Sequence, residues 1–293
     1  MNGTRRSQAG SSLISLVTLL LTSAPALAQI EPSPVPMENP TATPTVMGGS
    51  ELTSIMQPGG SLVIAVPLVI SLSKDFVADP INIPLDIYYG VSDDLTLGIT
   101  HSNGVVQGVM PYQITRGLCL SGDVFCSKPG PAADRSHRFY NNIGLDALLR
   151  LAAGTLQLAG HGGLDFASLD PSAIHLRLGV LAKAPLGENI AILTDPRVLI
   201  ALNKRDAGND DYLTFPIAVQ LGTASGLRLS GMTGISGPLD GFGDAFTGWL
   251  GAFLALGVNQ SVDVFGSFTF ETLYGKNGGA DWRTLVIGAN FRL

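Results

Sequence analysis

Acidic, basic and imidazole side chains recur at alternating positions in the middle of the chain. If neighbouring strands present them on one face, six of them can act together. The six are Asp146, Arg150, His161, Asp165, His175 and Arg177. With tight turns at 152–154 and near Pro171, Asp146 would lie opposite His161, and Asp165 opposite His175. Opposite charges that face each other across strands stabilise the pairing, so we expect one polar cluster.

Two roles are open for such a cluster. Opposed charges on the wall of a narrow passage focus an electric field and can form a constriction or a solute-binding site. The same charges can instead form an interior salt-bridge network that closes the passage, and the pattern favours this structural role. We expect each histidine to pair with a carboxylate rather than to ligate a metal. No metal site and no cofactor is predicted.

The composition points to a membrane protein without membrane helices. Charged residues make up 14% of the 293 residues, hydrophobic residues make up 45%, and the chain holds 36 glycines. Beyond the N-terminus there is no run of about 18 apolar residues, which a membrane-spanning helix requires. Apolar residues spread by alternation are typical of a membrane β-barrel. The net charge of −6 argues against a nucleic-acid partner.

The N-terminal region divides into two predicted parts. Residues 1–28 have the features of a cleaved secretion signal: Arg5 and Arg6, a short apolar core, and the cleavage motif Ala26-Leu27-Ala28. The competing interpretation is a membrane anchor, which the short core disfavours. Residues 29–59 are rich in Pro and Thr without periodicity, and we expect a disordered periplasmic tail. Residues 60–293 are expected to form the barrel.

From residue 60 onward, period-two alternation predicts β-strands. The last segment shows it most clearly, because Leu285, Ile287 and Ala289 share one face while Thr284 and Asn290 share the other. The same test predicts about twelve strands, each long enough to cross a bilayer when tilted. Their spans are 61–72, 81–89, 95–103, 138–151, 155–166, 173–183, 190–202, 212–221, 226–236, 245–256, 261–272 and 281–293.

The connections between these strands alternate in length. Short turns such as A-A-G and T-A-S-G alternate with mostly longer loops, as in bacterial outer-membrane barrels. This parity places the tail and the C-terminus on the periplasmic side. The longest loop, 104–137, holds the two cysteines of the chain, Cys119 and Cys126, which in a secreted protein predict a disulfide.

The uninterrupted apolar face of each strand is the expected lipid face. Leu145 and Leu149 on one predicted strand, and Leu176 and Leu178 on another, belong to it, and no charge falls on this face of these strands. A lysine or arginine there would cost ~2–4 kcal/mol at the bilayer midplane. The alternative is that these residues form the core of a soluble β-sandwich, which the low charge content disfavours.

The C-terminal strand I-G-A-N-F-R-L resembles the terminal strand of bacterial outer-membrane β-barrel proteins, and Y-Y-G-V-S-D-D-L-T-L-G-I at 88–99 is similar to their strand–turn–strand pieces. The resemblance covers the chain from about residue 60 and is at the level of the superfamily. It implies an all-β transmembrane barrel in the outer membrane, in contact with its lipid. It also implies that Phe291 and Leu293 form a signal for the barrel assembly machinery, although the terminal residue is more commonly Phe.

Three functions follow from these observations. The first is a narrow pore for small solutes, because about twelve strands lie between ~8 in filled barrels and ~16 in open channels. The second is a non-conducting barrel that displays the loop with Cys119 and Cys126. The third is a lipid-hydrolysing enzyme, since G-I-T-H-S-N-G at 98–104 resembles a motif of outer-membrane phospholipase A. Adjacent His101 and Ser102 would face opposite sides of a strand, so no enzyme activity is expected.

Overall fold

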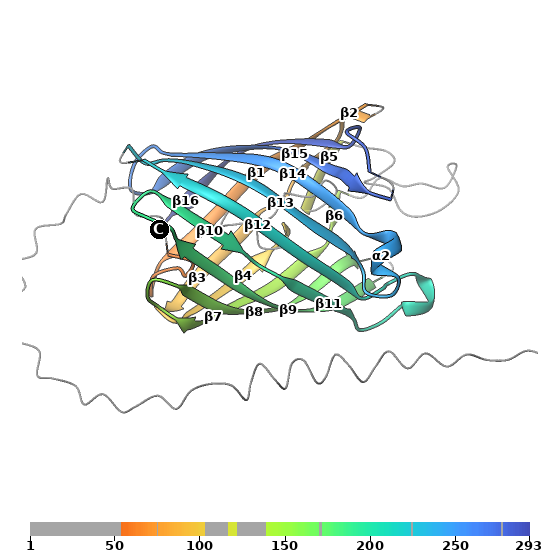
Figure 1. The fold of residues 1–293 in the computed structure, drawn as a ribbon, viewed down its shortest axis with the longest axis horizontal. Coiled ribbons are helices and arrows are strands. Elements are labelled where there is room, and N and C mark those ends of the chain that lie inside the picture. Colours follow the sequence, from red (N-terminus) through yellow and green to blue (C-terminus); the bar gives the residue numbers. More distant parts are fainter. Residues whose placement is uncertain are drawn as a thin grey trace, which may run out of the picture. The chain divides into compact units, whose positions relative to one another are not determined.

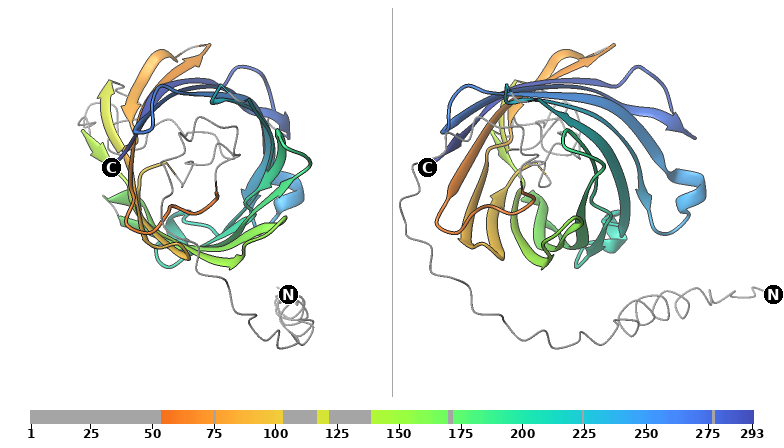
Figure 2. Two further views of the ribbon diagram at one scale, coloured as in Figure 1. Left: turned by 90° about the vertical axis from the view of Figure 1, so that its left-hand side faces the viewer. Right: turned by 60° about the vertical axis from the view of Figure 1, so that its left-hand side comes forward.

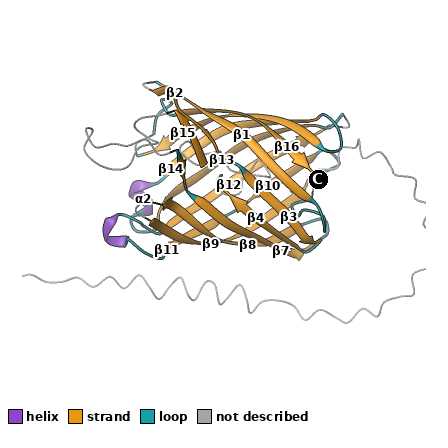
Figure 3. Ribbon diagram, turned by 180° about the vertical axis from the view of Figure 1, so that it is seen from behind, coloured by secondary structure: helices purple, strands orange, loops and turns teal. Residues whose placement is uncertain are grey.

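The computed structural model describes residues 54–74, 76–102, 117–121, 139–169, 172–223, 225–276 and 278–293. Strands dominate these ranges, with one short α-helix, α2 (Phe242–Ala245), and a 3-10 turn at Arg205–Ala207 (Figures 1 and 3). Within them, no helix has the length and apolar character needed to span a bilayer. The predicted signal peptide (1–28) and most of the predicted tail (29–53) lie outside the described residues and stay predictions.

The strands follow one another around a single antiparallel sheet. Their bounds are β1 Leu62–Ser73, β2 Phe76–Ile83, β3 Asp86–Ser92, β4 Leu95–Thr100, β5 Gly117–Ser121, β6 Tyr140–Asn141, β7 Ile143–Ala152, β8 Gln157–Leu169, β9 Ser172–Pro185, β10 Ile190–Thr194, β11 Arg197–Ala201, β12 Tyr212–Gly222, β13 Leu227–Pro238, β14 Thr247–Gly257, β15 Val262–Gly275 and β16 Arg283–Arg292.

The sheet closes on itself because its first strand pairs with its last. β1 and β16 run antiparallel in continuous register from Val63↔Arg292 to Ser71↔Thr284. Figure 2 shows the resulting ring in the left-hand view, looking along the barrel. Closure leaves no sheet edge, which lipid requires because it cannot solvate unpaired backbone groups. The wall has twelve strands, which confirms the predicted all-β barrel and excludes the soluble sandwich.

Sixteen assigned strands become twelve wall strands because four wall strands each consist of two assigned segments, namely β2 and β3, β4 and β5, β6 and β7, and β10 and β11. The predicted strand 81–89 is divided between β2 and β3, the strand 190–202 breaks at Asp195-Pro196, and the strand 138–151 breaks at Asn142, whose φ is 50°. β5, within the predicted loop 104–137, was not expected as a strand, and it pairs with β2. β5 lengthens the wall locally beyond the end of β4.

The two faces of the wall differ in polarity, as the alternation predicts. On β7, Leu145 and Leu149 are exposed on the outside, while Asp146 between them is buried on the inside. On β12, Ile217 and Val219 are exposed while Ala218 is buried. An apolar outside and a polar inside reverse the arrangement of a soluble barrel. The outer surface is therefore the membrane face.

The two ends of the barrel differ in their connections. One end carries Leu293 and five short turns, 93–94, 153–156, 186–189, 223–226 and 258–261. We call it the short-turn end; the opposite end, with the connections 202–211, 239–246 and 276–282, is the long-loop end. The predicted alternation of short and longer connections is therefore present in part, because the long-loop end also has the two-residue connections 74–75 and 170–171. The two ends define the barrel axis, and the positions of inward residues on neighbouring strands can be compared along this axis.

Candidate lumen site

The inward faces of β7, β8, β9, β10 and β11 bring six charged or imidazole side chains together on one side of the lumen. We call this set the lumen cluster; its members are Asp146, His161, Asp165, Arg177, Asp195 and Arg197. All six side chains are buried. Regular β alternation places Asp146, His161, Asp165 and Arg177 on the inside. The break at Asp195-Pro196 between β10 and β11 adds Asp195 from a non-strand position.

Within the lumen cluster, groups of opposite charge alternate. His161 lies between two carboxylates, with Nε2 2.7 Å from Asp146 Oδ1 and Nδ1 3.1 Å from Asp195 Oδ1. Arg177 Nη1 donates to Asp146 Oδ1 at 3.0 Å, and its Nη2 lies 4.0 Å from Asp165 Oδ1.

Arg197 extends this series of charged contacts, because it donates a hydrogen bond to Asp195. Taken in the order of their contacts, the members are Arg197, Asp195, His161, Asp146, Arg177 and Asp165. Three carboxylates therefore alternate with three groups that carry or can accept positive charge. When His161 donates from both ring nitrogens it is in its imidazolium form, and the chain of charges is then balanced.

The structure brings together four of the six residues predicted for this cluster: Asp146, His161, Asp165 and Arg177. One predicted register is wrong, because Asp146 pairs with Gly163 rather than with His161. The turn after β7 is longer than expected and shifts the register by two positions. His161 is therefore the diagonal neighbour of Asp146, still within side-chain reach.

Two predicted members lie elsewhere. Asp165 does pair with His175 across the strands, but His175 Nε2 is hydrogen-bonded to the carbonyl oxygen of Asp210 at 3.2 Å, in a connection of the long-loop end. Arg150 lies at the short-turn end, where its Nε is 3.4 Å from Asp94 Oδ1. Neither residue belongs to the alternating chain of charges.

Asp195 and Arg197 were the members that the prediction missed. The predicted cluster is confined to the strands 138–151, 155–166 and 173–183, whereas Asp195 and Arg197 belong to the next predicted strand, whose ladder Pro196 weakens. One signal was available, because a buried carboxylate in an apolar segment needs a partner and Arg197 is two residues away. The interruption places both side chains in the lumen rather than ending the wall strand.

A second polar group lies nearer the short-turn end. Asp263 on β15 accepts from Arg228 on β13 at 3.2 Å and from Arg292 on β16. Lys183 on β9 is also buried on the inner wall. Positive side chains outnumber carboxylates among these four residues, whereas the lumen cluster combines three carboxylates with two arginines and one histidine. The fixed charge of the inner wall thus changes along the barrel axis.

His101 and Ser102 follow the end of β4 at Thr100, so strand alternation does not apply to them and both are buried. This corrects the expectation that they face opposite sides. The His101 ring contacts the carbonyl oxygen of Leu85 and, through Nε2 at 2.6 Å, the Tyr140 hydroxyl. The Ser102 hydroxyl donates to Asp86. Both side chains serve to anchor the end of β4 to β3 and β6.

Two further predictions concern the cysteines of the loop 104–137 and the C-terminal residues of the last strand. Cys119 is buried on β5, but Cys126 lies outside the described residues, so the disulfide stays a prediction. Leu293 exchanges two backbone hydrogen bonds of 2.9 Å with Leu62 and thereby ties the C-terminus to β1. The side chains of Phe291 and Leu293 are exposed on the outside. Their recognition by the assembly machinery stays a prediction.

Comparison with protein-family models finds no match, and comparison with curated protein sequences finds none either. Solved structures do match. KdgM porin aligns with a TM-score of 0.52 at 7% identity over 78% of this chain and 98% of its own. NanC porin aligns with 0.53 at 9% identity over 78% and 100%. An outer membrane channel from Pseudomonas putida F1 aligns with 0.50 at 12% identity over 81% and 97%.

These identities establish the fold alone. Together with the closed twelve-stranded wall and the apolar outer face, they confirm the resemblance seen in the last strand. The chain therefore has the closed, antiparallel β-barrel fold of these porins and this outer membrane channel.

Proposed function

We propose that the protein is a narrow pore that lets small hydrophilic solutes cross the outer membrane, with the short-turn end facing the periplasm. The alternating charges of the lumen cluster, on the inner wall of a closed barrel, carry this proposal. In channels, rings of charged side chains and narrow constrictions select which solutes pass. Because both signs occur side by side, the field runs across the lumen and orients dipolar solutes.

The barrel size and the comparisons support the same function. Twelve strands lie between ~8, where side chains fill the interior, and ~16, where an aqueous channel is open. The solved structures of the same fold include two that are described as porins and one described as a channel. We propose no enzymatic activity, since the His101 ring and the Ser102 hydroxyl are each engaged with other groups.

A second candidate is a non-conducting barrel that displays the loop around Cys119 and Cys126. The burial of all six lumen-cluster side chains favours it, because a salt-bridge network in the lumen can close a barrel. The two candidates differ in whether solutes cross the folded protein.

A swelling assay on proteoliposomes separates the two candidates. Vesicles that contain the folded protein are diluted into iso-osmotic solutions of uncharged sugars of increasing size. We expect swelling with the smallest sugars that falls steeply with size, because the bore is narrow. Protein-free vesicles and vesicles with heat-unfolded protein are the controls. Gel mobility shows whether the protein in the vesicles is folded. If folded protein produces no swelling, the pore function is wrong and the loop-display function takes its place.

A further inference from the structure

The described chain begins inside the barrel. Residues Ser54 to Gly60, which we call the N-terminal segment, lead to β1, and Figure 2 shows them within the ring at the start of the orange part of the chain. The prediction assigned residues up to 59 to a disordered tail, and the structure differs from it here. Ile55 and Met56 are only 1% and 3% exposed. Two apolar side chains at the end of a polar, Pro-rich stretch were the signal that the sequence offered.

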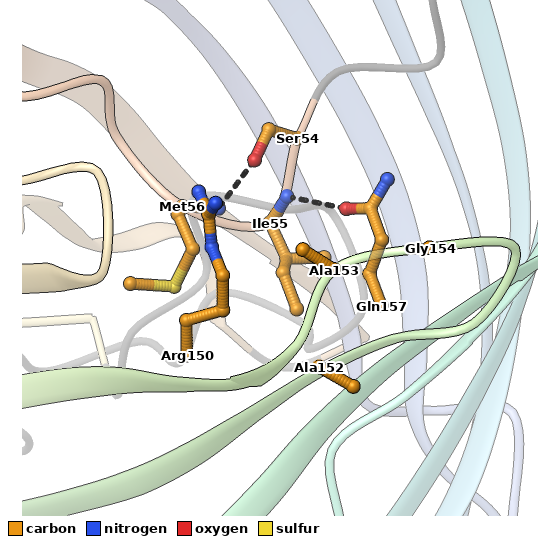
Figure 4. A pocket seen from close by; sticks show the side chains of 8 residues that line it. All are labelled: Ser54, Ile55, Met56, Arg150, Ala152, Ala153, Gly154 and Gln157. Carbon is orange, nitrogen blue, oxygen red and sulfur yellow. Dashed lines mark hydrogen bonds between the residues drawn. The ribbon is translucent and has the colours of Figure 1, made fainter. Parts of the chain in front are cut away.

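Hydrogen bonds hold the N-terminal segment against three places on the wall. The backbone N–H of Ile55 donates to Gln157 Oε1 on β8 at 3.1 Å (Figure 4), and that of Gln57 donates to Thr96 Oγ1 on β4 at 3.0 Å. The N–H of Gly60 donates to the carbonyl oxygen of Gly90 on β3 at 2.7 Å. Bonds to three separate wall strands fix the path of the segment across the lumen side of the wall.

The fit between the segment and β3 depends on a glycine. A Cβ at Gly90 would lie 2.9 Å from the carbonyl oxygen of Gln57 and closer still to the backbone of Pro58. Any side chain at position 90 would therefore push the segment away from the wall. Gly231 on β13 offers the contrast, because a Cβ there meets no atom within 4 Å.

Ile55 and Met56 add to an apolar layer of the lumen. They belong to one buried apolar cluster with wall residues Leu148, Ala159, Leu181 and Leu193. Each of these wall residues lies one inward position nearer the short-turn end than Asp146, His161, Gly179 and Asp195 respectively. The apolar layer therefore follows the lumen cluster on the way to the short-turn end.

We propose that the N-terminal segment is a hydrophobic seal that narrows the lumen between the lumen cluster and the periplasmic mouth, with Ile55 and Met56 setting the bore. This inference rests on the proposed pore function and names the residues that limit the width of the pore. Apolar constrictions impede ions because water leaves them readily. The seal thus restricts what the lumen cluster admits.

A cavity beside the seal provides space for it to be displaced. Its volume is about 160 Å³, and it lies between Ser54–Met56 and the β7–β8 turn (Figure 4). Arg150 and Gln157 give its wall a polar side. Polar side chains at positions 55 and 56 would therefore hydrate this region instead of excluding water.

The first test compares single-channel conductance in planar bilayers. An Ile55→Ser, Met56→Ser double variant is expected to conduct several-fold more than the unaltered protein, as is Gly90→Ala. The matched controls are Leu186→Ser in an exposed turn of the same end and Gly231→Ala, both expected to leave conductance unchanged. Folded variants with unaltered conductance would overturn the seal while the pore stands.

The second test does not depend on conduction. Cysteines are placed at Ile55 and, separately, at Leu186, in a chain whose Cys119 and Cys126 are replaced by serine, and a water-soluble thiol reagent is added to the folded protein. We expect Ile55→Cys to react much more slowly than Leu186→Cys, and Gly90→Ala to speed its reaction. Equal rates at the two positions would overturn the seal, whether or not the barrel conducts.

Discussion

Replacing Arg177 by methionine is expected to lower the free energy of unfolding by about 3–5 kcal/mol. The Arg177 side chain is 1% exposed and lies between Asp146 and Asp165. Methionine keeps most of the volume but removes the positive charge that lies between the two buried carboxylates of Asp146 and Asp165, so the cost of burying their negative charges rises. Urea unfolding in lipid vesicles, followed by the fluorescence of Trp249 and Trp282, measures the change.

The matched control for this variant is Arg205→Met. Arg205 also pairs with an aspartate, Asp211, at 2.6 Å, but its side chain is half-exposed in a connection of the long-loop end. Exposed ion pairs contribute roughly 0–1 kcal/mol, so a small change is expected. An Arg177→Met, Asp146→Asn double variant should recover part of the loss. Equal changes at positions 177 and 205 would contradict a buried lumen cluster.

Replacing Leu178 by arginine is expected to cost ~2–4 kcal/mol, the cost of a basic side chain at the bilayer midplane on the lipid face of a barrel. Leu178 is next to Arg177 on β9 but points to the opposite face, where it is 49% exposed. An arginine is thus tolerated at 177 and excluded at 178. The same unfolding measurement in vesicles detects the difference.

Leu186→Arg is the control for the lipid face. Leu186 is 64% exposed in the β9–β10 turn, at the short-turn end. Near the membrane interface the same substitution costs ~0–1 kcal/mol. If Leu178→Arg cost no more than Leu186→Arg, the outer surface of β9 would not lie in lipid, and the membrane assignment of the barrel would be wrong.

The barrel could be predicted from the sequence because lipid imposes a simple rule on every strand. The outward positions of β7, such as Leu145 and Leu149, are all apolar, and the rule applies to each strand independently of its neighbours. The missed details are those that depend on local geometry. β5 is only five residues long, and the break at Asn142 requires a left-handed conformation that the alternation does not reveal.

The lumen cluster could be predicted only in part, because it depends on register across several strands. Four members follow from alternation on β7, β8 and β9. Asp195 enters the lumen from an interruption at Pro196, and Arg150 leaves the set because its depth along the barrel differs from that of Asp146. The seal at Ile55 could not be placed, since its contacts join residues about a hundred positions apart, as with Gln157.

The most direct test of the account is ion selectivity through single channels, measured as the reversal potential under a salt gradient. The unaltered protein is expected to open in discrete steps. Asp195→Asn removes one negative charge from the lumen cluster while keeping a hydrogen-bonding side chain, so its reversal potential should shift towards anion preference. Asp244→Asn, in the exposed helix α2, should leave the reversal potential unchanged. A folded Asp195→Asn variant with the selectivity of the unaltered protein would contradict a conducting path along the lumen cluster.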